Sequence, residues 1–425
     1  MKRTLIALAV GSAFAAPAAY ADVTLSGSIN AGPAYVHSGD GSTNAANSFS
    51  ATGPTAQSGQ SLSGINTNYS NITVGSLEDL GGGLKLDFAF QMTANFQNAG
   101  TGNPGNRNSH IGLVGDSWGG VWYGTNEQLY EAYMYTVDPL DGAAGMGGNL
   151  QMLGTPGYGV VFDAPSGDPS SCATGAHGSG CAGFYRRDSQ AIWYNTPNFN
   201  GFSGGAYLTL PAFKNTANGA IGVNSINPWL WGLGAKYVGP SMPIQAWIAY
   251  EQHEDMFGLG VITNQGGGQW IGAGGAADSS KDYGLQVGVG YTFGDIFAYV
   301  NFEQLKYQDN IDPTFGGGTA DYKRNAWSIG AKWNIATGYV GGQFIDALNA
   351  SCTLPGTGCT ADHTSGYMVG LGYYHTLSKQ TQAYVMGTYI HNGDLNFYTT
   401  AGGVGPAVNL GSQIWGLTVG LKHSF

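Results

Sequence analysis

The segment Trp415-Gly416-Leu417-Thr418-Val419-Gly420-Leu421-Lys422-His423-Ser424-Phe425, at the C-terminal end of the sequence, alternates between two kinds of side chain. The residues of one set are mostly large and apolar: Trp415, Leu417, Val419, Leu421, His423 and Phe425. The residues between them are small or polar. Alternation with a period of two is typical of a β-strand with one apolar and one polar face. The apolar face would meet a core in a soluble sandwich and lipid in a membrane barrel.

The composition favours the membrane barrel. The chain of 425 residues holds 72 Gly, 25 Tyr, 18 Phe and 10 Trp, and only 10% of its residues are charged. Soluble domains average about 25% charged residues, which they need to cover their surface. No segment after the N-terminus approaches the roughly 20 uninterrupted apolar residues of a membrane helix, so a helical membrane protein is excluded. A barrel with a polar interior also explains a mean hydropathy of only −0.10.

The N-terminus predicts export. Lys2 and Arg3 precede an apolar run, and Ala19-Tyr20-Ala21 forms a small-residue cleavage site before Asp22. We interpret residues 1–21 as a secretory signal peptide and residues 22–425 as one mature domain. Without the two basic residues of the signal, 13 basic and 26 acidic residues remain, an acidic balance that argues against nucleic-acid binding.

The four cysteines form two close pairs, Cys172 with Cys181 and Cys352 with Cys359. Four cysteines allow three connectivities, and the two local bridges are favoured in an oxidising compartment. The spacings of nine and seven do not fit the CxxC pattern of zinc sites, so we expect disulfides, no metal and no cofactor.

The mature chain divides into about 16 alternating segments. The clearest begins at Leu84, with Leu84, Leu86, Phe88, Phe90 and Met92 on one face. The predicted strands are 22–36, 69–78, 84–96, 107–115, 121–126, 187–195, 202–210, 229–238, 243–254, 282–293, 296–308, 322–334, 339–347, 365–377, 381–391 and 412–425. About seven short turns alternate with about eight long loops, one of them the Ser/Gly/Asn-rich segment up to about residue 67 and the longest at 127–185. No segment of useful length with a helical period interrupts the predicted strands.

An even number of strands with one short and one long end is typical of a transmembrane antiparallel β-barrel. Side chains cannot fill a barrel of this size, so the interior is expected to hold water. Gly284, Gly288 and Gly290 are expected to face it, and Leu285, Val287, Val289 and Tyr291 to face lipid. Five tryptophans are candidates for the aromatic girdles at the membrane surfaces: Trp229, Trp231, Trp327, Trp333 and Trp415.

Several motifs, in this order, resemble the trimeric general porins of Gram-negative outer membranes, of the neisserial and β-proteobacterial type. They are Asp22-Val23-Thr24-Leu25-Ser26-Gly27, Ser76-Leu77-Glu78-Asp79-Leu80-Gly81-Gly82-Gly83-Leu84-Lys85, Asn106-Arg107-Asn108-Ser109-His110-Ile111-Gly112-Leu113 with Trp118-Gly119, Tyr194-Asn195-Thr196-Pro197-Asn198-Phe199-Asn200-Gly201-Phe202, Leu377-Ser378-Lys379 and the terminal Gly420–Phe425. Together they extend over the whole mature chain.

The resemblance implies a water-filled channel for passive diffusion of ions and small hydrophilic solutes, assembled as a homotrimer. It implies contact with outer-membrane lipid and lipopolysaccharide, and recognition of Phe425 as an assembly signal by the barrel-assembly machinery. It also implies that the third long loop folds inward and narrows the channel, with acidic loop residues facing a basic wall. On this basis the loop acids are Glu127, Glu131, Asp138 and Asp141. The wall residues are Lys85, Arg107 and Arg187, followed by Arg186, Arg324 and Lys332.

Two features depart from the family pattern. The third loop is long and carries a cysteine pair, and Trp193 stands where related porins tend to place a basic residue. An aromatic lining would suit more apolar or ring-bearing solutes. The alternative for each charged residue is a solvated loop or rim position without a role in selectivity.

Other functions compatible with a barrel are a substrate-specific channel with a binding site in the constriction, and a surface adhesin or receptor. An enzyme is not expected, because the sequence has no HExxH motif and no GxSxG at a strand-to-helix junction.

Overall fold

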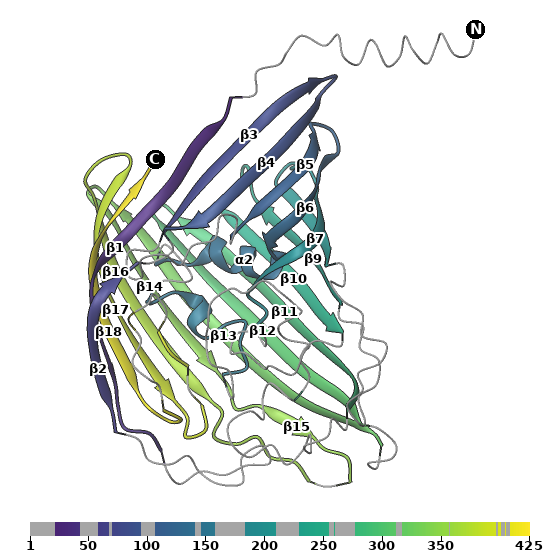
Figure 1. Cartoon of the computed structure of the whole chain (residues 1–425). Coiled ribbons are helices and arrows are strands. Elements are labelled where there is room, and N and C mark those ends of the chain that lie inside the picture. Colours follow the sequence, from purple (N-terminus) through teal and green to yellow (C-terminus); the bar gives the residue numbers. More distant parts are fainter. Residues whose placement is uncertain are drawn as a thin grey trace.

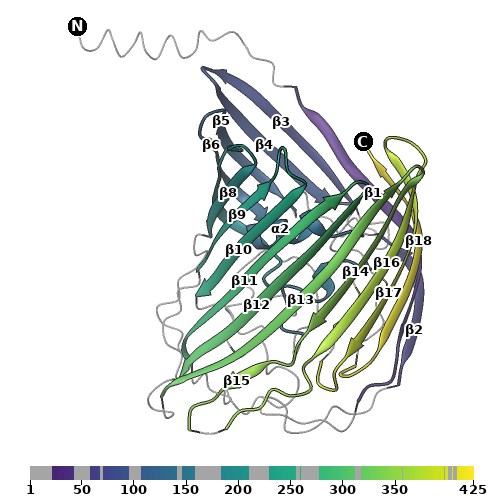
Figure 2. The same cartoon turned by 180° about the vertical axis from the view of Figure 1, so that it is seen from behind.

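The alternating C-terminal segment forms β18, Ile414–Ser424, which pairs antiparallel with β1, Thr24–Ser38, and closes the sheet. The computed structural model describes residues 22–42, 58–67, 70–94, 107–140, 146–157, 183–209, 229–254, 259, 277–311, 317–356, 358–396, 398–400, 404 and 409–425. The predicted signal peptide, Asp141 and the pair Cys172 and Cys181 lie outside these residues. Figures 1 and 2 show the closed wall from two opposite sides.

The wall consists of strands that pair antiparallel in sequence order. After β1 they are β2 Gln60–Asn66, β3 Asn71–Gly81, β4 Leu84–Thr93, β5 Ser109–Gly115, β6 Gly119–Glu127, β7 Arg187–Asn195, β8 Phe202–Thr209, β9 Trp229–Val238 and β10 Ile244–Glu254. The second half contains β11 Ala277–Phe293, β12 Ile296–Ile311, β13 Thr319–Ile335, β14 Gly338–Ala347, β15 Ser351–Thr353, β16 Gly366–Thr376, β17 Thr381–Asn392 and β18.

These segments correspond to 16 barrel strands. β2 and β3 both pair with β1, one along Gly32–Ser38 and the other along Thr24–Ser28, so they are two parts of one interrupted strand. In the same way, β14 and β15 both pair with β13. The predicted 16-stranded antiparallel barrel is therefore confirmed. β2 corrects the prediction of a continuous loop before residue 67, because backbone pairing with β1 holds a polar segment that has little alternation of its own.

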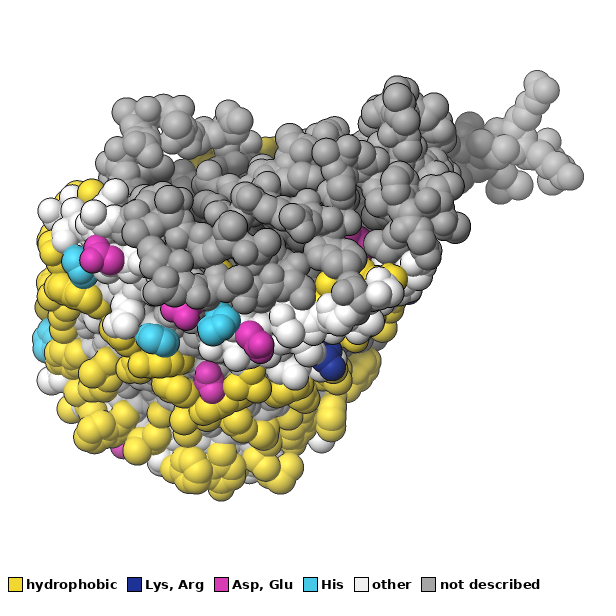
Figure 3. All heavy atoms as spheres, turned by 90° about the horizontal axis from the view of Figure 1, so that it is seen from below, with side chains coloured by type: hydrophobic (Ala, Val, Ile, Leu, Met, Phe, Trp, Pro, Cys, Tyr) yellow, Lys and Arg dark blue, Asp and Glu magenta, His cyan; other side chains and the backbone are white. Residues whose placement is uncertain are grey.

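Alternation places apolar residues on the outside of the wall. Val287, Val289 and Tyr291 are each at least 40% exposed, as expected for side chains that face lipid. Outward-facing rings also contact one another near the long-loop ends of the strands. Tyr35 lies 5.2 Å from Trp415, Trp327 lies 5.3 Å from Phe344, and Trp231 lies 5.3 Å from Tyr250, all between ring centroids. In Figure 3 the apolar surface ends at a narrow zone with acidic, histidine and basic side chains.

The loop after β6 enters the barrel, where Figures 1 and 2 show its helix inside the wall. This helix, α2 Leu129–Val137, contacts β8, β9, β10 and β11, and a short 3₁₀ turn, η1 Asn149–Gln151, follows it. The helix lies in the loop between β6 and β7, where the sequence analysis did not predict one. Tyr130, Tyr133, Met134 and Val137 are buried at the i, i+3, i+4, i+7 spacing of an amphipathic helix.

Among the described residues, no helix has both the length and the apolar character needed to cross a membrane.

Glycines on the inner face let aromatic rings lie flat against the wall. A Cβ at Gly288 would collide with the Trp247 ring of the adjacent strand, and one at Gly330 with the Tyr299 ring. Both rings are about 5% exposed and fill the inner surface without rising far into the interior. The packed core therefore lies between the inner wall and the inserted loop, where the buried apolar residues of α2 and residues 146–153 meet inward tyrosines.

Candidate functional site

A β-bulge in β7 turns consecutive side chains toward the interior. Asn126 of β6 pairs with Asp188 and Gly124 with Ala191, so Ser189 and Gln190 lie opposite a single residue. Gln190 has a φ of 56°, a left-handed backbone conformation that residues other than glycine rarely adopt. Bulges of this kind re-aim side chains. Here Arg187 and Asp188 are both buried.

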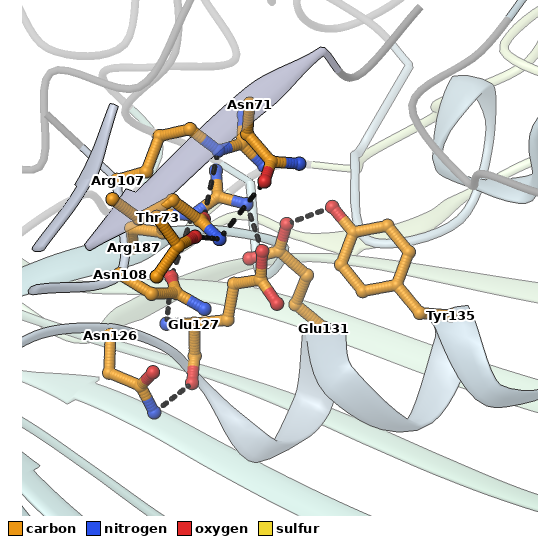
Figure 4. Close-up of polar contacts among 10 residues, drawn as sticks. Asn71, Thr73, Arg107, Asn108, Asn126, Glu127, Glu131, Tyr135 and Arg187 are labelled. Atoms are coloured by element: carbon orange, nitrogen blue, oxygen red, sulfur yellow. Dashed lines mark hydrogen bonds and ion pairs between the residues drawn. The ribbon is translucent and has the colours of Figure 1, made fainter. Parts of the chain in front are cut away.

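Arg187 and the end of β6 form the centre of a charged cluster, which we call the arginine cluster (Figure 4). The cluster is defined by Arg107, Arg187, Glu127 and Glu131. Arg187 Nη2 forms an ion pair with Glu127 Oε1, and Arg187 Nε donates to Asn108 Oδ1 at 2.9 Å. Asn108 Oδ1 also accepts from the backbone N–H of Glu127 at 3.2 Å. One amide thus ties the guanidinium to the strand that leads into α2.

Arg107 is held by a polar chain on the neighbouring strands. Its Nε donates to Gln91 Oε1 at 3.0 Å, and Gln91 Nε2 donates to Thr73 Oγ1 at 3.0 Å. Arg107 is only 5% exposed. The side chain is therefore fixed by β3 and β4 rather than extended into solvent.

Glu131 lies in the first turn of α2 and is 2% exposed. Its Oε1 accepts a hydrogen bond from Tyr135 Oη at 2.5 Å (Figure 4). Burial disfavours the carboxylate and raises the pKa of Glu131 to about 7, against the opposing effect of Arg187. This acid therefore changes its charge near neutral pH.

The structure brings four of the residues expected at the constriction together on one side of the barrel. Arg187 and Glu127 touch rather than face each other across an interior space. Asp138 lies outside this cluster. Its two carboxylate oxygens accept from the backbone N–H groups of Leu140 and Asn149, each at 2.8 Å, and so shape the loop.

Arg186 and Arg324 are buried in separate ion pairs. Arg186 Nε lies 2.6 Å from Asp188 Oδ1, and Asp188 Oδ2 accepts from Gln128 Nε2 at 2.7 Å. Arg324 Nη2 pairs with Glu303 Oε1, and both side chains are fully buried. Neither arginine forms an exposed basic wall.

Glu303, which the sequence analysis did not single out, anchors the inserted loop. Its Oε2 accepts from Tyr130 Oη and from the backbone N–H of Gly154, each at 2.7 Å. Wall side chains also bond loop carbonyls, since Gln343 Nε2 donates to Gly147 O at 2.6 Å. A detectable signal was present: alternation places Val300 and Phe302 outward, so Glu303 is an acid on the inner face of a strand.

Two lysines that were predicted for the basic wall, Lys85 and Lys332, lie nearer the short turns than the arginine cluster does. Lys85 Nζ forms an ion pair with Asp116 Oδ1 at 3.1 Å, six residues along β4 from Gln91, so it is not part of the arginine cluster. Lys332 Nζ lies 3.9 Å from the centre of the Tyr339 ring. Two further lysines, Lys236 and Lys422, occupy inner-face positions near the short-turn ends of β9 and β18.

Trp193 faces inward, but it is only 7% exposed. It stacks on Trp122 with ring centroids 6.1 Å apart and an interplanar angle of 14°, and His110 meets its edge. Trp122 Nε1 donates to Asp87 Oδ2 at 2.8 Å. The tryptophan pair therefore forms part of the packed inner wall.

Cys352 and Cys359 form a disulfide, as expected. Phe425 extends the seam between the chain ends, because its N–H donates to Gly27 O at 3.1 Å and its carbonyl accepts from Gly27 N at 3.0 Å. Within the described part of the chain, no group of three or more His, Cys, Asp or Glu residues is arranged to hold a metal ion.

A closed 16-stranded antiparallel barrel with a loop folded inside it is the architecture of outer-membrane porins. The sequence profile of the Gram-negative porin family matches residues 4–395, and the chain belongs to this family. It is therefore a porin of the Gram-negative outer membrane, a non-enzymatic channel for passive diffusion of ions and small hydrophilic solutes.

Known relatives agree with this assignment. Outer membrane porin protein 32 of Delftia acidovorans is 27% identical over 429 residues and covers 100% of both chains. An outer membrane porin protein of Bordetella pertussis is 26% identical over 370 residues, or 79% of this chain and 91% of that protein. Among solved structures, the anion-selective porin from Comamonas acidovorans has a TM-score of 0.65 and 22% identity, covering 95% of this chain and 100% of that one.

Proposed function

We propose that the channel prefers anions, and that lysines between the inserted loop and the short turns provide this preference. Four lysines lie in this half of the barrel, and we call them the inner lysines. They are Lys85, which is paired with Asp116, and Lys236, Lys332 and Lys422. The anion preference would then come from lysines beside the constriction and not from the arginines within it.

The ion pairs around the inserted loop support this assignment. Arg187 pairs with Glu127, Arg186 with Asp188, and Arg324 with Glu303. An arginine whose charge is offset by a touching carboxylate contributes little field beyond a Debye length of about 8 Å. These pairs hold the loop, but they leave only a small net charge for sorting solutes.

The inner lysines are the main remaining source of positive charge on the lumen side. The face of the wall on which each of these lysines lies can be read from glycines on the same or the paired strand. A Cβ at Gly234 would meet Tyr133 of the inserted loop, one at Gly341 would meet Pro139, and one at Gly416 would meet Met146. Alternation then places Lys236, beside Gly234, and Lys422 on the same inner face.

Lys332 pairs with Gly341 across the sheet and shares its face. On the lumen-facing positions of the described strands in this half, the acids are Asp79 and Asp87, and Asp116 of the adjoining turn pairs with Lys85. Excess positive charge along a pore attracts anions and repels cations. The fold shared with an anion-selective porin is consistent with this preference.

The test is the reversal potential of single channels in a tenfold salt gradient across a planar bilayer. Wild-type protein is expected to favour chloride, and the triple variant Lys236→Gln, Lys332→Gln, Lys422→Gln to lose at least half of that preference. The matched control is Lys306→Gln, which removes a lysine from the outer face and leaves selectivity unchanged. A cation-selective wild type, or an unchanged triple variant, would refute the assignment.

We further propose that the barrels assemble as homotrimers in a lipopolysaccharide-containing leaflet, and that Phe425 is an assembly signal. Motif resemblance supports all three, and a trimer form is described for OmpT of Vibrio cholerae, whose structure has a TM-score of 0.54 to this chain. The outward apolar surface is suited to lipid or to neighbouring barrels.

A further inference from the structure

Two lysines oppose each other on the outer face of the barrel. Lys306 of β12 and Lys323 of β13 are direct cross-strand partners. They point outward, because their neighbours Leu305, Tyr322 and Arg324 are fully buried on the inner side. Like charges directly opposite each other in a sheet are destabilising unless another group compensates them.

The compensation within the protein is incomplete. Lys306 Nζ lies 3.4 Å from Asp321 Oδ2, and the nearby Lys281 Nζ lies 3.3 Å from Glu254 Oε1. Each of these two acids is therefore already paired with one lysine. Among the described residues, Lys323 has no ion pair. The patch, which we call the outer lysine patch, thus holds three lysines and two acids.

The patch lies at the height of membrane head groups. Phe302 and Trp327 pair across the sheet in the aromatic band, Gln304 Nε2 bonds Asn325 Oδ1 in the next outward row, and the lysine pair follows. Lys306 lies four positions beyond Phe302, which is roughly 13 Å along the strand. Figure 3 shows charged side chains along the border of the apolar surface.

The segment beside Lys323 is held in place. β15 pairs with the end of β13, with Ser351 opposite Lys323, and Cys352 of the same strand is joined to Cys359. The hydroxyl of Ser351 adds a hydrogen-bond donor next to the ammonium groups. A fixed cluster of ammonium and hydroxyl donors is suited to a phosphate group.

We propose that the outer lysine patch binds a phosphate of lipopolysaccharide in the outer leaflet. This inference rests on the proposed lipopolysaccharide environment. A phosphate placed between Lys306 and Lys323 would compensate the opposed charges, while the acyl chains would lie along Phe302 and Trp327. The site thus combines an anionic head group with an apolar surface directly below it.

The experiment compares wild type with Lys306→Gln, Lys323→Gln in detergent by native mass spectrometry. The probe is bisphosphorylated lipid A, with monophosphoryl lipid A and inorganic phosphate as separate arms. Each basic residue near an anionic membrane surface contributes about 1 kcal/mol, so the double variant is expected to bind the bisphosphorylated lipid at least about tenfold more weakly. The matched control, Lys379→Gln in a short turn at the other end, is expected to bind like wild type.

Equal binding of bisphosphorylated lipid A by the double variant and wild type would overturn the proposal. Full competition by inorganic phosphate at equimolar concentration would overturn it too, because the site would then recognise a free anion. The double variant is also measured for single-channel conductance. If the double variant conducts normally and binds the lipid as wild type does, only the patch is refuted. If the wild type itself shows no conductance, the channel assignment is refuted.

Discussion

Single charged side chains in this porin act mainly through their immediate partners. Arg187 is fixed by Glu127 and Asn108, and the bulge at Gln190 makes this contact possible. Glu131 differs, because burial leaves it poised to change charge near neutral pH. It is the acid in the arginine cluster through which pH can alter the field of the channel.

Selectivity is expected to depend on pH through Glu131. The pKa of Glu131 rises from 4.5 to about 7, so the side chain is neutral in mildly acidic solution and negative in mildly basic solution. The anion preference should fall, by roughly twofold in permeability ratio, between pH 6 and pH 8 because one negative charge is added near the pore. Reversal potentials across this pH range provide the measurement.

Glu131→Gln supplies the control, since it keeps every histidine and removes only this titration. The variant should show a flat profile, and an equally steep one would contradict the assignment. The same shift affects docking of α2. Because the folded pKa exceeds 4.5, protonation stabilises the docked helix fully below about pH 4.5, and this contribution is lost as the pH rises through 7.

At the scale of elements, sequence alternation predicted the wall well and the inserted loop poorly. β7 and β9 have their predicted bounds, because outward apolar residues alternate regularly along them. β2 could not be predicted from its own residues, since its pairing with β1 holds it. α2 carried a helical spacing that short length and many tyrosines obscured.

The candidate site was predictable in residue type more than in geometry. Arg107, Arg187, Glu127 and Glu131 do meet, but direct pairing depends on the bulge at Gln190, which no composition signal marks. The burial of Arg324 depends on where the loop rests against β12 and β13. Only tertiary packing determines that position.

The anchor between Tyr130 and Glu303 is expected to hold α2 against the wall. Tyr130→Phe removes a hydrogen bond to a buried carboxylate, an interaction that contributes about 1.5–3 kcal/mol. Hydrogen–deuterium exchange of a peptide covering residues 129–137 should therefore be roughly tenfold faster or more. Open-channel current noise should rise in the same variant.

Tyr133→Phe is the matched control on the same helix. Its hydroxyl has no hydrogen bond among the described residues, and its ring packs on the inner wall. Exchange in this variant should stay near the wild-type rate. If the two variants behaved alike, ring packing rather than the Glu303 hydrogen bond would hold the helix.

For the molecule as a whole, closure of the barrel depends on the seam between β1 and β18. The seam runs from Ser38 opposite Ile414 to Ser28 opposite Ser424, and Phe425 adds two backbone hydrogen bonds to Gly27. A closed barrel has no free strand edge, which is what allows it to exist in lipid. The last residue therefore matters for the wall as well as for the proposed recognition.

Removal of Phe425 is expected to reduce assembly several-fold without abolishing folding. The variant loses two of many seam hydrogen bonds, each contributing about 1 kcal/mol, together with the proposed signal. The measurement is the amount of heat-modifiable trimer in isolated outer membranes, compared with the same protein refolded in detergent. A defect confined to membranes supports the signal, equal loss in both supports the seam alone, and a wild type without a trimer band contradicts the homotrimer.

The aromatic rings that lie over inner-face glycines affect the width of the channel, and small changes at these glycines would alter that width. At Gly330, a single added methyl group would lift the Tyr299 ring away from the sheet and toward the passing solute. The same holds for Gly288 beneath Trp247. A porin lineage can therefore narrow or widen its passage in small steps at such positions, with no change in strand number, register or loop length.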